Sequence, residues 1–126
     1  MLFMLSNRAQ LALFDIRDNI KLAEDFAAGL SFEAFAADRR TFYAVTRCLE
    51  IISEAARRLP AAVRNRHPAL PWRAIMGAGN VYRHDYDNVA EQMVWRTVKD
   101  SLAALHAAVE SEIASLDDDV QADPKP

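Results

Sequence analysis

The spacing of the apolar residues constrains this chain more than any other feature, because they recur at intervals of three and four along three long segments. Such a period places them on one face of an α-helix, and that face must be buried against another element. No stretch shows the apolar–polar alternation of a half-buried β-strand. Only three Gly and five Pro occur in 126 residues, so few residues interrupt helices. The pattern predicts an all-α protein.

The first long helix is expected from about Arg8 to Ala28, with Asn7 as its N-cap and Gly29 as its stop. Ser31 is expected to cap a short helix that follows at once. The apolar stripe of the first helix consists of Leu13, Ile16, Ile20, Ala23, Ala27 and Leu30.

A second long helix is expected over residues 38–59, ended by Pro60. Residues 61–66 are expected to form a helical turn or two, and Pro71 to open a shorter helix that begins at Trp72 and reaches Gly77-Ala78-Gly79. A third long helix should run from Val89 to Leu116. These elements predict one domain over residues 1–116, an antiparallel four- to five-helix bundle, followed by a frayed acidic tail over residues 117–126.

The chain has one cysteine, Cys48, among apolar positions of the second long segment. We interpret it as a small core residue, because a lone Cys forms no internal disulfide and suggests a reducing compartment. The apolar N-terminus lacks the basic region and cleavage site of a signal peptide, and no apolar run approaches the length of a membrane span. We therefore expect a cytoplasmic protein without a membrane anchor.

The net charge is −3, but no acidic residue lies between Glu54 and Asp85. That interval carries six arginines, and guanidinium groups match the geometry of phosphates. We therefore take Arg64, Arg66 and Arg73 as candidate phosphate or RNA contacts. The alternative is a solvated, arginine-rich helix face.

One segment, residues 80–86, has the composition of a reactive site. On a helix, Asn80 and His84 share a face, and Arg83 flanks the same side. A histidine can transfer protons near neutral pH, and an arginine can hold a phosphate. RNA supplies its own 2′-hydroxyl as nucleophile, so this set suits RNA cleavage without a metal. In the alternative interpretation, these residues form a surface ion-pair cluster and Tyr86 packs against a neighbouring helix.

Other kinds of site find little support in the sequence. Adjacent residues such as His84 and Asp85 are poorly spaced for two metal ligands on one helix, and His67 and His106 have no obvious partners. No Ser or Cys nucleophile has a triad pattern, and no Gly-rich loop precedes a Lys. We expect neither a metal nor a cofactor.

Several motifs together resemble the HepT-like proteins of the HEPN superfamily. Similar stretches are Leu-Phe-Asp-Ile at 13–16, Leu-Glu-Ile-Ile-Ser-Glu-Ala at 49–55, Pro-Ala-Leu-Pro-Trp at 68–72 and Val-Trp at 94–95. Ser53 stands where the family usually has Gly. The resemblance spans residues 13–113 and implies a helical bundle that forms a homodimer.

The resemblance also implies a function. Family members are RNase toxins with an Arg-x4–6-His motif, often continued as His-x-Tyr, in a polar groove at the dimer interface. Their partner is a small nucleotidyltransferase antitoxin of the MNT type, which adds AMP to the Tyr. By this match His84 is the motif histidine, Tyr86 the AMP acceptor, and Asn80 the polar residue after the motif arginine.

The arginine of that motif has no counterpart, because the position five residues before His84 is Gly79 and the longer spacings fall on Ala78 and Gly77. Three interpretations stay open. Arg83 or an arginine of a second subunit takes its role, or the chain has lost strong RNase activity, or it is a non-catalytic partner that binds a nucleotide or a nucleotidyltransferase.

Overall fold

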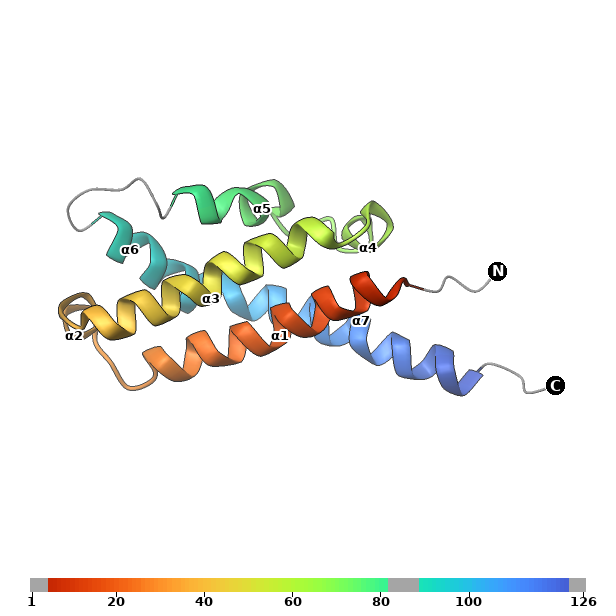
Figure 1. The fold of residues 1–126 in the computed structure, drawn as a ribbon, viewed down its shortest axis with the longest axis horizontal. Coiled ribbons are helices and arrows are strands. Elements are labelled where there is room, and N and C mark those ends of the chain that lie inside the picture. Colours follow the sequence, from red (N-terminus) through yellow and green to blue (C-terminus); the bar gives the residue numbers. More distant parts are fainter. Residues whose placement is uncertain (1–4, 82–88, 123–126) are drawn as a thin grey trace.

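The computed structural model describes residues 5–81 and 89–122, without the side chains of residues 80, 81, 89 and 117–122 (Figure 1). The described part is helical and contains no strand, which confirms the all-α prediction. The elements are α1 (Asn7–Ala27), α2 (Phe32–Ala37), α3 (Arg39–Arg58), α4 (Ala61–Asn65), α5 (Trp72–Val81), α6 (Val89–Arg96), the π-helix η1 (Thr97–Ser101) and α7 (Leu102–Ala122).

The centre of the bundle is the antiparallel pair α1 and α3, which lie side by side along most of their length (Figure 1). α7 packs against α1, and α5 runs antiparallel to α3 along its C-terminal half. The short helix α2 contacts both α3 and α6 at one end of the bundle, whereas α4 lies at the other end.

The core consists of the apolar stripes that the spacing predicts. Leu13, Ile16 and Ile20 of α1 are fully buried, and they meet buried residues of α3 and α7. Burial of such side chains contributes roughly 1.5–3 kcal/mol each to stability. Cys48 lies in the same core, and burial raises the pKa of its thiol, so it remains protonated as the sequence interpretation requires.

Side-chain caps fix the starts of the first three helices. Ser6 Oγ accepts the Ala9 N–H over 3.1 Å, so Ser6 is the N-cap of α1 and the prediction of Asn7 is wrong by one residue. Ser31 caps α2 as expected, and Asp38 caps α3 by accepting the Thr41 N–H. α1 ends before Gly29, whose φ of +76° is a conformation that glycine adopts without strain.

The last predicted helix differs from the structure in two ways. It contains the π-helical segment η1, in which the Leu102 N–H reaches back to the Thr97 carbonyl, and its final part continues past the predicted end at Leu116 to Ala122. The buried residues Ala90, Val94, Val98 and Leu102 are each four apart. A wider turn keeps such residues on one face, because four residues exceed one α-helical turn of 3.6.

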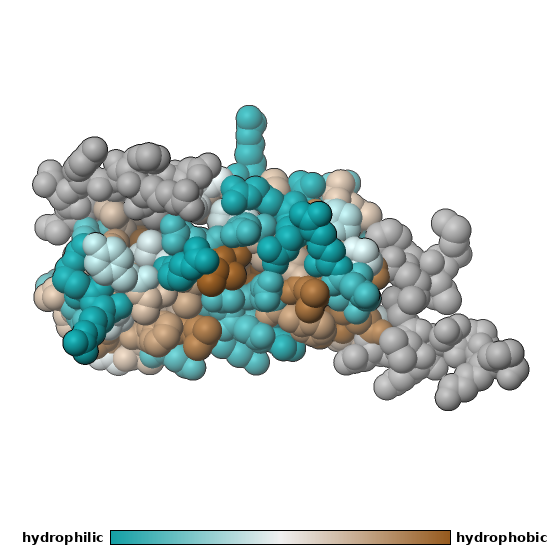
Figure 2. All heavy atoms as spheres, in the orientation of Figure 1, coloured by the Kyte–Doolittle hydropathy of each residue, from teal (hydrophilic) through white to brown (hydrophobic). Residues whose placement is uncertain are grey.

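One face of the molecule is mostly hydrophilic, with apolar side chains in separate spots (Figure 2). Large apolar side chains that remain exposed include Leu11, Leu22 and Phe26, all on α1. Within the described ranges, no helix is long and apolar enough to cross a bilayer.

Candidate functional site

The segment that the sequence singles out lies largely outside the described residues. Asn80 is in the last turn of α5, but its side chain is not described, and Arg83, His84 and Tyr86 fall within residues 82–88. The predicted convergence of these side chains therefore stays a prediction. The structure does place the two elements that flank them, since α5 ends at Val81 and α6 begins at Val89.

Both flanking helices pack against α3. α5 is fixed by Ser53, whose side-chain hydroxyl donates to the Met76 carbonyl over 2.8 Å and accepts the Gly79 N–H over 3.3 Å. Arg57 also donates to the Met76 carbonyl, over 3.0 Å. The last two turns of α5, which lead into the candidate segment, are thus held to α3 by three hydrogen bonds.

The close approach of α3 and α5 determines where position 79 points. A Cβ built on Gly79 would lie 3.6 Å from Ser53 Oγ and 3.8 Å from Glu50 Cα, both ordinary contacts. Gly79 is buried, so a longer side chain there would start against the backbone of α3. At Gly77, by contrast, a Cβ would meet nothing within 4 Å.

α6 is tied to α3 by a partly buried ion pair. Glu91, in the first turn of α6, is 7% exposed and accepts from Arg39 Nη1 over 3.0 Å. The Arg39 guanidinium lies about 5.0 Å from the ring centres of Phe42 and Tyr43. The start of α6, directly after residues 82–88, therefore lies beside the start of α3. The spacing of residues along the sequence does not predict that Arg39 and Glu91 form a pair.

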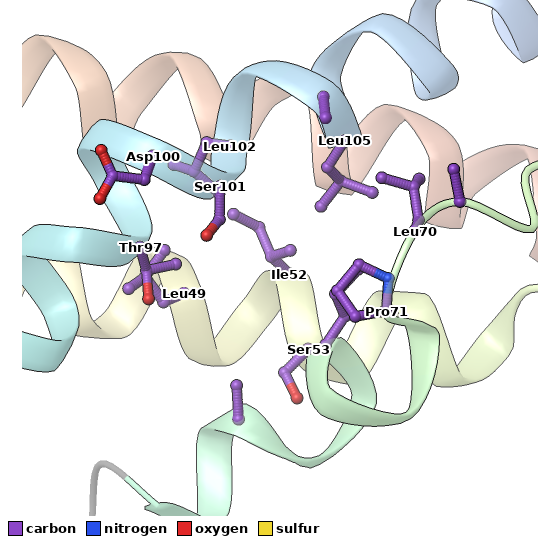
Figure 3. A pocket seen from close by; sticks show the side chains of 14 residues that line it. Leu49, Ile52, Ser53, Leu70, Pro71, Thr97, Asp100, Ser101, Leu102 and Leu105 are labelled. Atoms are coloured by element: carbon purple, nitrogen blue, oxygen red, sulfur yellow. The ribbon is translucent and has the colours of Figure 1, made fainter.

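A cavity of about 250 Å³ opens beside α5, where α3, α5 and the η1–α7 segment meet (Figure 3). Its wall is mostly apolar, with Leu49, Ile52 and Leu105 facing it. Ser53, Thr97, Asp100 and Ser101 contribute the polar groups. A second hollow, on the neighbouring side of α5, is shared with η1 and Met93. The π-helix thus lines both hollows along α5.

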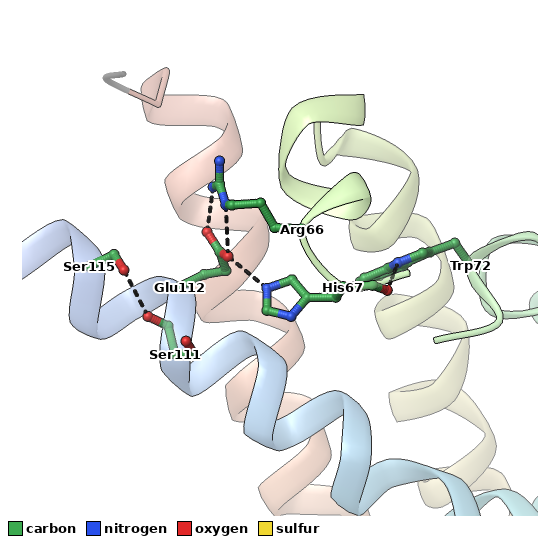
Figure 4. Close-up of polar contacts among 6 residues, drawn as sticks. All are labelled: Arg66, His67, Trp72, Ser111, Glu112 and Ser115. Carbon is green, nitrogen blue, oxygen red and sulfur yellow. Dashed lines mark hydrogen bonds and ion pairs between the residues drawn. The ribbon is translucent and has the colours of Figure 1, made fainter. Parts of the chain in front are cut away.

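Two of the three arginines proposed as phosphate contacts are engaged elsewhere. Arg66 donates to both carboxylate oxygens of Glu112, over 2.6 and 3.1 Å, and His67 Nε2 is 2.6 Å from the same carboxylate (Figure 4). The half-buried Arg64 donates to the Leu59 carbonyl. Both belong to the α4 end of the bundle, opposite the end where α6 begins (Figure 1). Arg73 is exposed in the first turn of α5.

The Glu112 cluster positions the start of α5. Burial would raise the pKa of Glu112, but the hydrogen bonds from Arg66 and His67 outweigh it, so the pKa is lowered and the carboxylate stays charged. The His67 carbonyl accepts from Trp72 Nε1 over 3.0 Å (Figure 4). Through these contacts α7 fixes the connection from α4 to α5.

Across the described ranges, no three His, Cys, Asp or Glu side chains are grouped so that they could hold a metal ion. The polar contacts of this part of the chain instead join helices to one another. They fix α5 and α6 on either side of the candidate segment.

Comparison with known proteins places the chain in a family. The model of the family described as "Ribonuclease HepT-like" matches residues 16–112. A probable ribonuclease HepT from Thermococcus cleftensis is 37% identical over 98 residues, covering 78% of this chain and 89% of that protein. A putative RNase from Methanocaldococcus jannaschii is 34% identical over 86 residues, covering 68% of this chain and 71% of its own length.

A putative RNase from Caldanaerobacter subterraneus is 36% identical over 81 residues, which are 64% of this chain and 72% of that protein. No solved structure matches the chain. The family match covers the bundle from within α1 to within α7 and includes the candidate segment between α5 and α6. The chain therefore belongs to the ribonuclease HepT-like family.

Proposed function

We propose that this chain is an RNase toxin-like subunit that cleaves RNA without a metal ion and is silenced by AMP addition to Tyr86. The observation that carries the proposal is the family match over residues 16–112, a range in which the sequence has His84 and Tyr86 with the spacing of a His-x-Tyr motif. Relatives named as ribonucleases, at 34–37% identity, support the same activity.

In the proposed reaction His84 removes the proton from a 2′-hydroxyl of RNA, and the oxygen attacks the adjacent phosphorus. The bond from phosphorus to the 5′-oxygen breaks, and that oxygen takes up a proton. The products are a 2′,3′-cyclic phosphate and a 5′-hydroxyl. Arg83 binds the phosphate whose negative charge is redistributed in the transition state, and Asn80 assists as a polar contact.

The proposal includes a homodimer, with the RNA groove at its interface, and an MNT-type nucleotidyltransferase as antitoxin. AMP on Tyr86 would add a negative charge two residues from His84, which disfavours the approach of RNA. Light scattering of the purified chain measures the oligomeric state. A monomer at the concentrations used for RNA cleavage would contradict the interface groove.

The test of the activity is degradation of RNA by the purified chain, compared with His84→Ala. We expect cleavage by the unaltered chain in the presence of EDTA, and a loss of at least about 100-fold in the variant. Equal, negligible cleavage by both proteins would overturn the proposal. Arg8→Gln serves as control, because that exposed arginine at the start of α1 is not among the candidate RNA contacts.

A second candidate function is a non-catalytic partner that binds a nucleotide or docks a nucleotidyltransferase. The observation that favours it is Gly79, which stands in place of the motif arginine and is buried against Ser53. Here co-expression with an MNT-type nucleotidyltransferase should give a stable complex, with mass spectrometry finding AMP on Tyr86, but no RNA cleavage. Absence of both the complex and the added mass would contradict this function.

A further inference from the structure

A hollow of about 260 Å³ lies between α2 and α6, at the end of the bundle where these helices meet. Its four lining residues are Phe32 from α2 and Gln92, Trp95 and Arg96 from α6. The two aromatic side chains are half-buried, whereas Gln92 and Arg96 are exposed. The lining therefore combines aromatic rings, an amide and a guanidinium, and none of the four is acidic.

The aromatic part of the hollow is held in place from behind. The Trp95 ring centre lies 5.2 Å from that of the fully buried Phe35 and 6.1 Å from that of Phe32. Rings packed in this way lose little further freedom when a ligand stacks on them. Lys99 Nζ lies 4.7 Å from the Trp95 ring centre, so the indole already attracts a cation. Because Lys99 is exposed, its ammonium can move from the ring to a phosphate.

The hollow lies close to the candidate catalytic segment along the chain. α6 begins at Val89, the residue after 82–88, so Gln92 and Arg96 follow about one and two turns later. With a rise of 1.5 Å per residue, they are roughly 5 and 10 Å along the axis from the start of α6. An RNA strand that follows α6 from its start at Val89 would meet Gln92 first, then Trp95 and then Arg96.

We propose that this hollow binds one unpaired nucleotide of single-stranded RNA, next to the phosphate that is cleaved. The base stacks on Trp95 against Phe32, the Gln92 amide hydrogen-bonds to the base edge, and Arg96 with Lys99 contacts the flanking phosphates. Only an unpaired base exposes both its face and its edge in this way, which assigns single-stranded rather than duplex RNA. This inference rests on the proposed RNase function, for which it supplies a substrate subsite.

The acidic side chains described on α2, α6 and η1 lie outside the lining of the hollow, and Asp100 of η1 lines the cavity beside α5 instead. Glu91 lies on α6 but is directed to Arg39, and Glu33 is exposed on α2, outside the lining of the hollow. Arg96 and Lys99 therefore give the site a local positive charge, although the net charge of the whole chain is −3. This charge complements the phosphates of RNA.

The two tryptophans of the chain, Trp72 and Trp95, allow a direct test. In a Trp72→Phe background, the emission of Trp95 is followed while a short 2′-O-methyl RNA is added, whose blocked 2′-oxygens prevent cleavage. We expect the emission to be quenched as the base stacks. Because Trp72 donates a hydrogen bond to the His67 carbonyl, binding is also measured on the chain with both tryptophans, by fluorescence anisotropy of labelled RNA.

The contribution of the lining residues to RNA binding is measured with the variant Arg96→Gln. The matched control is Arg8→Gln, because Arg8 is also an exposed arginine but lies at the start of α1. We expect Arg96→Gln to weaken binding of the 2′-O-methyl RNA at least about fivefold, and Arg8→Gln to leave it within about twofold. Equal affinity of the two variants, together with unchanged Trp95 emission, would overturn the proposal. Quenching by the nucleotidyltransferase but not by RNA would overturn it as well.

Failure of this subsite and failure of the proposed RNase function give different results. If the chain binds 2′-O-methyl RNA with quenching of Trp95 but cuts no RNA, the subsite stands and the RNase function fails. If His84→Ala abolishes cleavage while Arg96→Gln changes neither binding nor cleavage, the RNase function stands and the subsite fails.

Discussion

The Gly79 N–H donates to Ser53 Oγ over 3.3 Å, while the same hydroxyl donates to the Met76 carbonyl over 2.8 Å. One serine of α3 thus holds both the second and the last turn of α5, the helix that leads into the candidate segment. Ser53 is only 1% exposed, so water does not replace these bonds when the hydroxyl is removed.

Ser53→Ala is therefore expected to lower the free energy of unfolding by about 1–2 kcal/mol, through the loss of a buried hydroxyl with two partners. Urea denaturation followed by circular dichroism measures the change. Ser115→Ala is a matched control, because its hydroxyl donates to the Ser111 carbonyl on an exposed face of α7. We expect less than about 0.5 kcal/mol there. Equal effects of the two changes would show that the Ser53 bonds do not hold α5.

Replacement by alanine is expected to have opposite effects on stability at two glycines, Gly29 and Gly77. Gly29→Ala is expected to destabilise the protein by about 1 kcal/mol, because φ at this residue is +76°. Gly77→Ala is expected to stabilise it by about 0.5–1 kcal/mol, because residue 77 is helical and a Cβ there meets nothing within 4 Å. Thermal or urea unfolding of both variants checks the signs, and a stabilising Gly29→Ala would contradict the observed end of α1.

Glu112 predicts a dependence of stability on pH. The pKa of this carboxyl is lowered from its ordinary value of 4.5. The contribution of the charged carboxylate to the free energy of unfolding is therefore complete above about pH 4.5, and it is lost as the pH falls through the folded-state pKa. Glu112→Gln should lower the free energy of unfolding by about 1–3 kcal/mol near pH 7, and the difference should shrink in acid.

The matched control for this prediction is Glu110→Gln on the same helix. Glu110 is about half exposed, and its carboxylate lies 3.3 Å from the half-buried His106. We expect a change below about 0.5 kcal/mol at neutral pH. A Glu112→Gln variant whose deficit stays constant from neutral to acidic pH would rule out the charged carboxylate as the source of the stability.

The helices follow from the sequence because burial of one face imposes a local period, which Leu13, Ile16 and Ile20 display directly. The exact ends depend on single hydrogen bonds, which is why Ser6 rather than Asn7 caps α1. The π-helix η1 has a local signal, the four-residue spacing of Ala90, Val94, Val98 and Leu102, which a search for the ordinary helical period does not separate out. The Arg66–Glu112 and Arg39–Glu91 pairs were not predictable in this way. Each depends on which helices meet in space, and spacing along one helix does not encode that.

The candidate site was predictable only as far as its residue types and motif. The acid-free interval marks Arg64 and Arg66 as possible phosphate contacts, but composition does not reveal that Glu112, far along the chain, neutralises Arg66. The hollow of Phe32, Gln92, Trp95 and Arg96 joins two helices that are distant in sequence. A Gln-x-x-Trp-Arg stretch with a later Lys was its one visible signal.

The pair Ser53 and Gly79 allows a test of how the chain departs from its family's motif. Gly79→Arg restores the motif arginine, but its Cβ starts 3.6 Å from Ser53 Oγ and the side chain must leave past α3. Ser53→Gly, the usual family residue, makes more room beside position 79 but removes two hydrogen bonds to α5. We therefore expect Gly79→Arg alone to destabilise the protein by about 1–3 kcal/mol, and the double variant to be no more stable than that.

If the proposed RNase function holds, the double variant should also cleave RNA at least about tenfold faster than the unaltered chain, since a guanidinium stabilises the charge that develops on the phosphate. The control is Gly79→Lys with Ser53→Gly, which restores a charge without the planar guanidinium. Cleavage rates are compared at equal fractions folded, because Ser53→Gly also removes two hydrogen bonds to α5. A double variant that folds well but cuts no faster would show that position 79 is not where this protein lacks a catalytic cation.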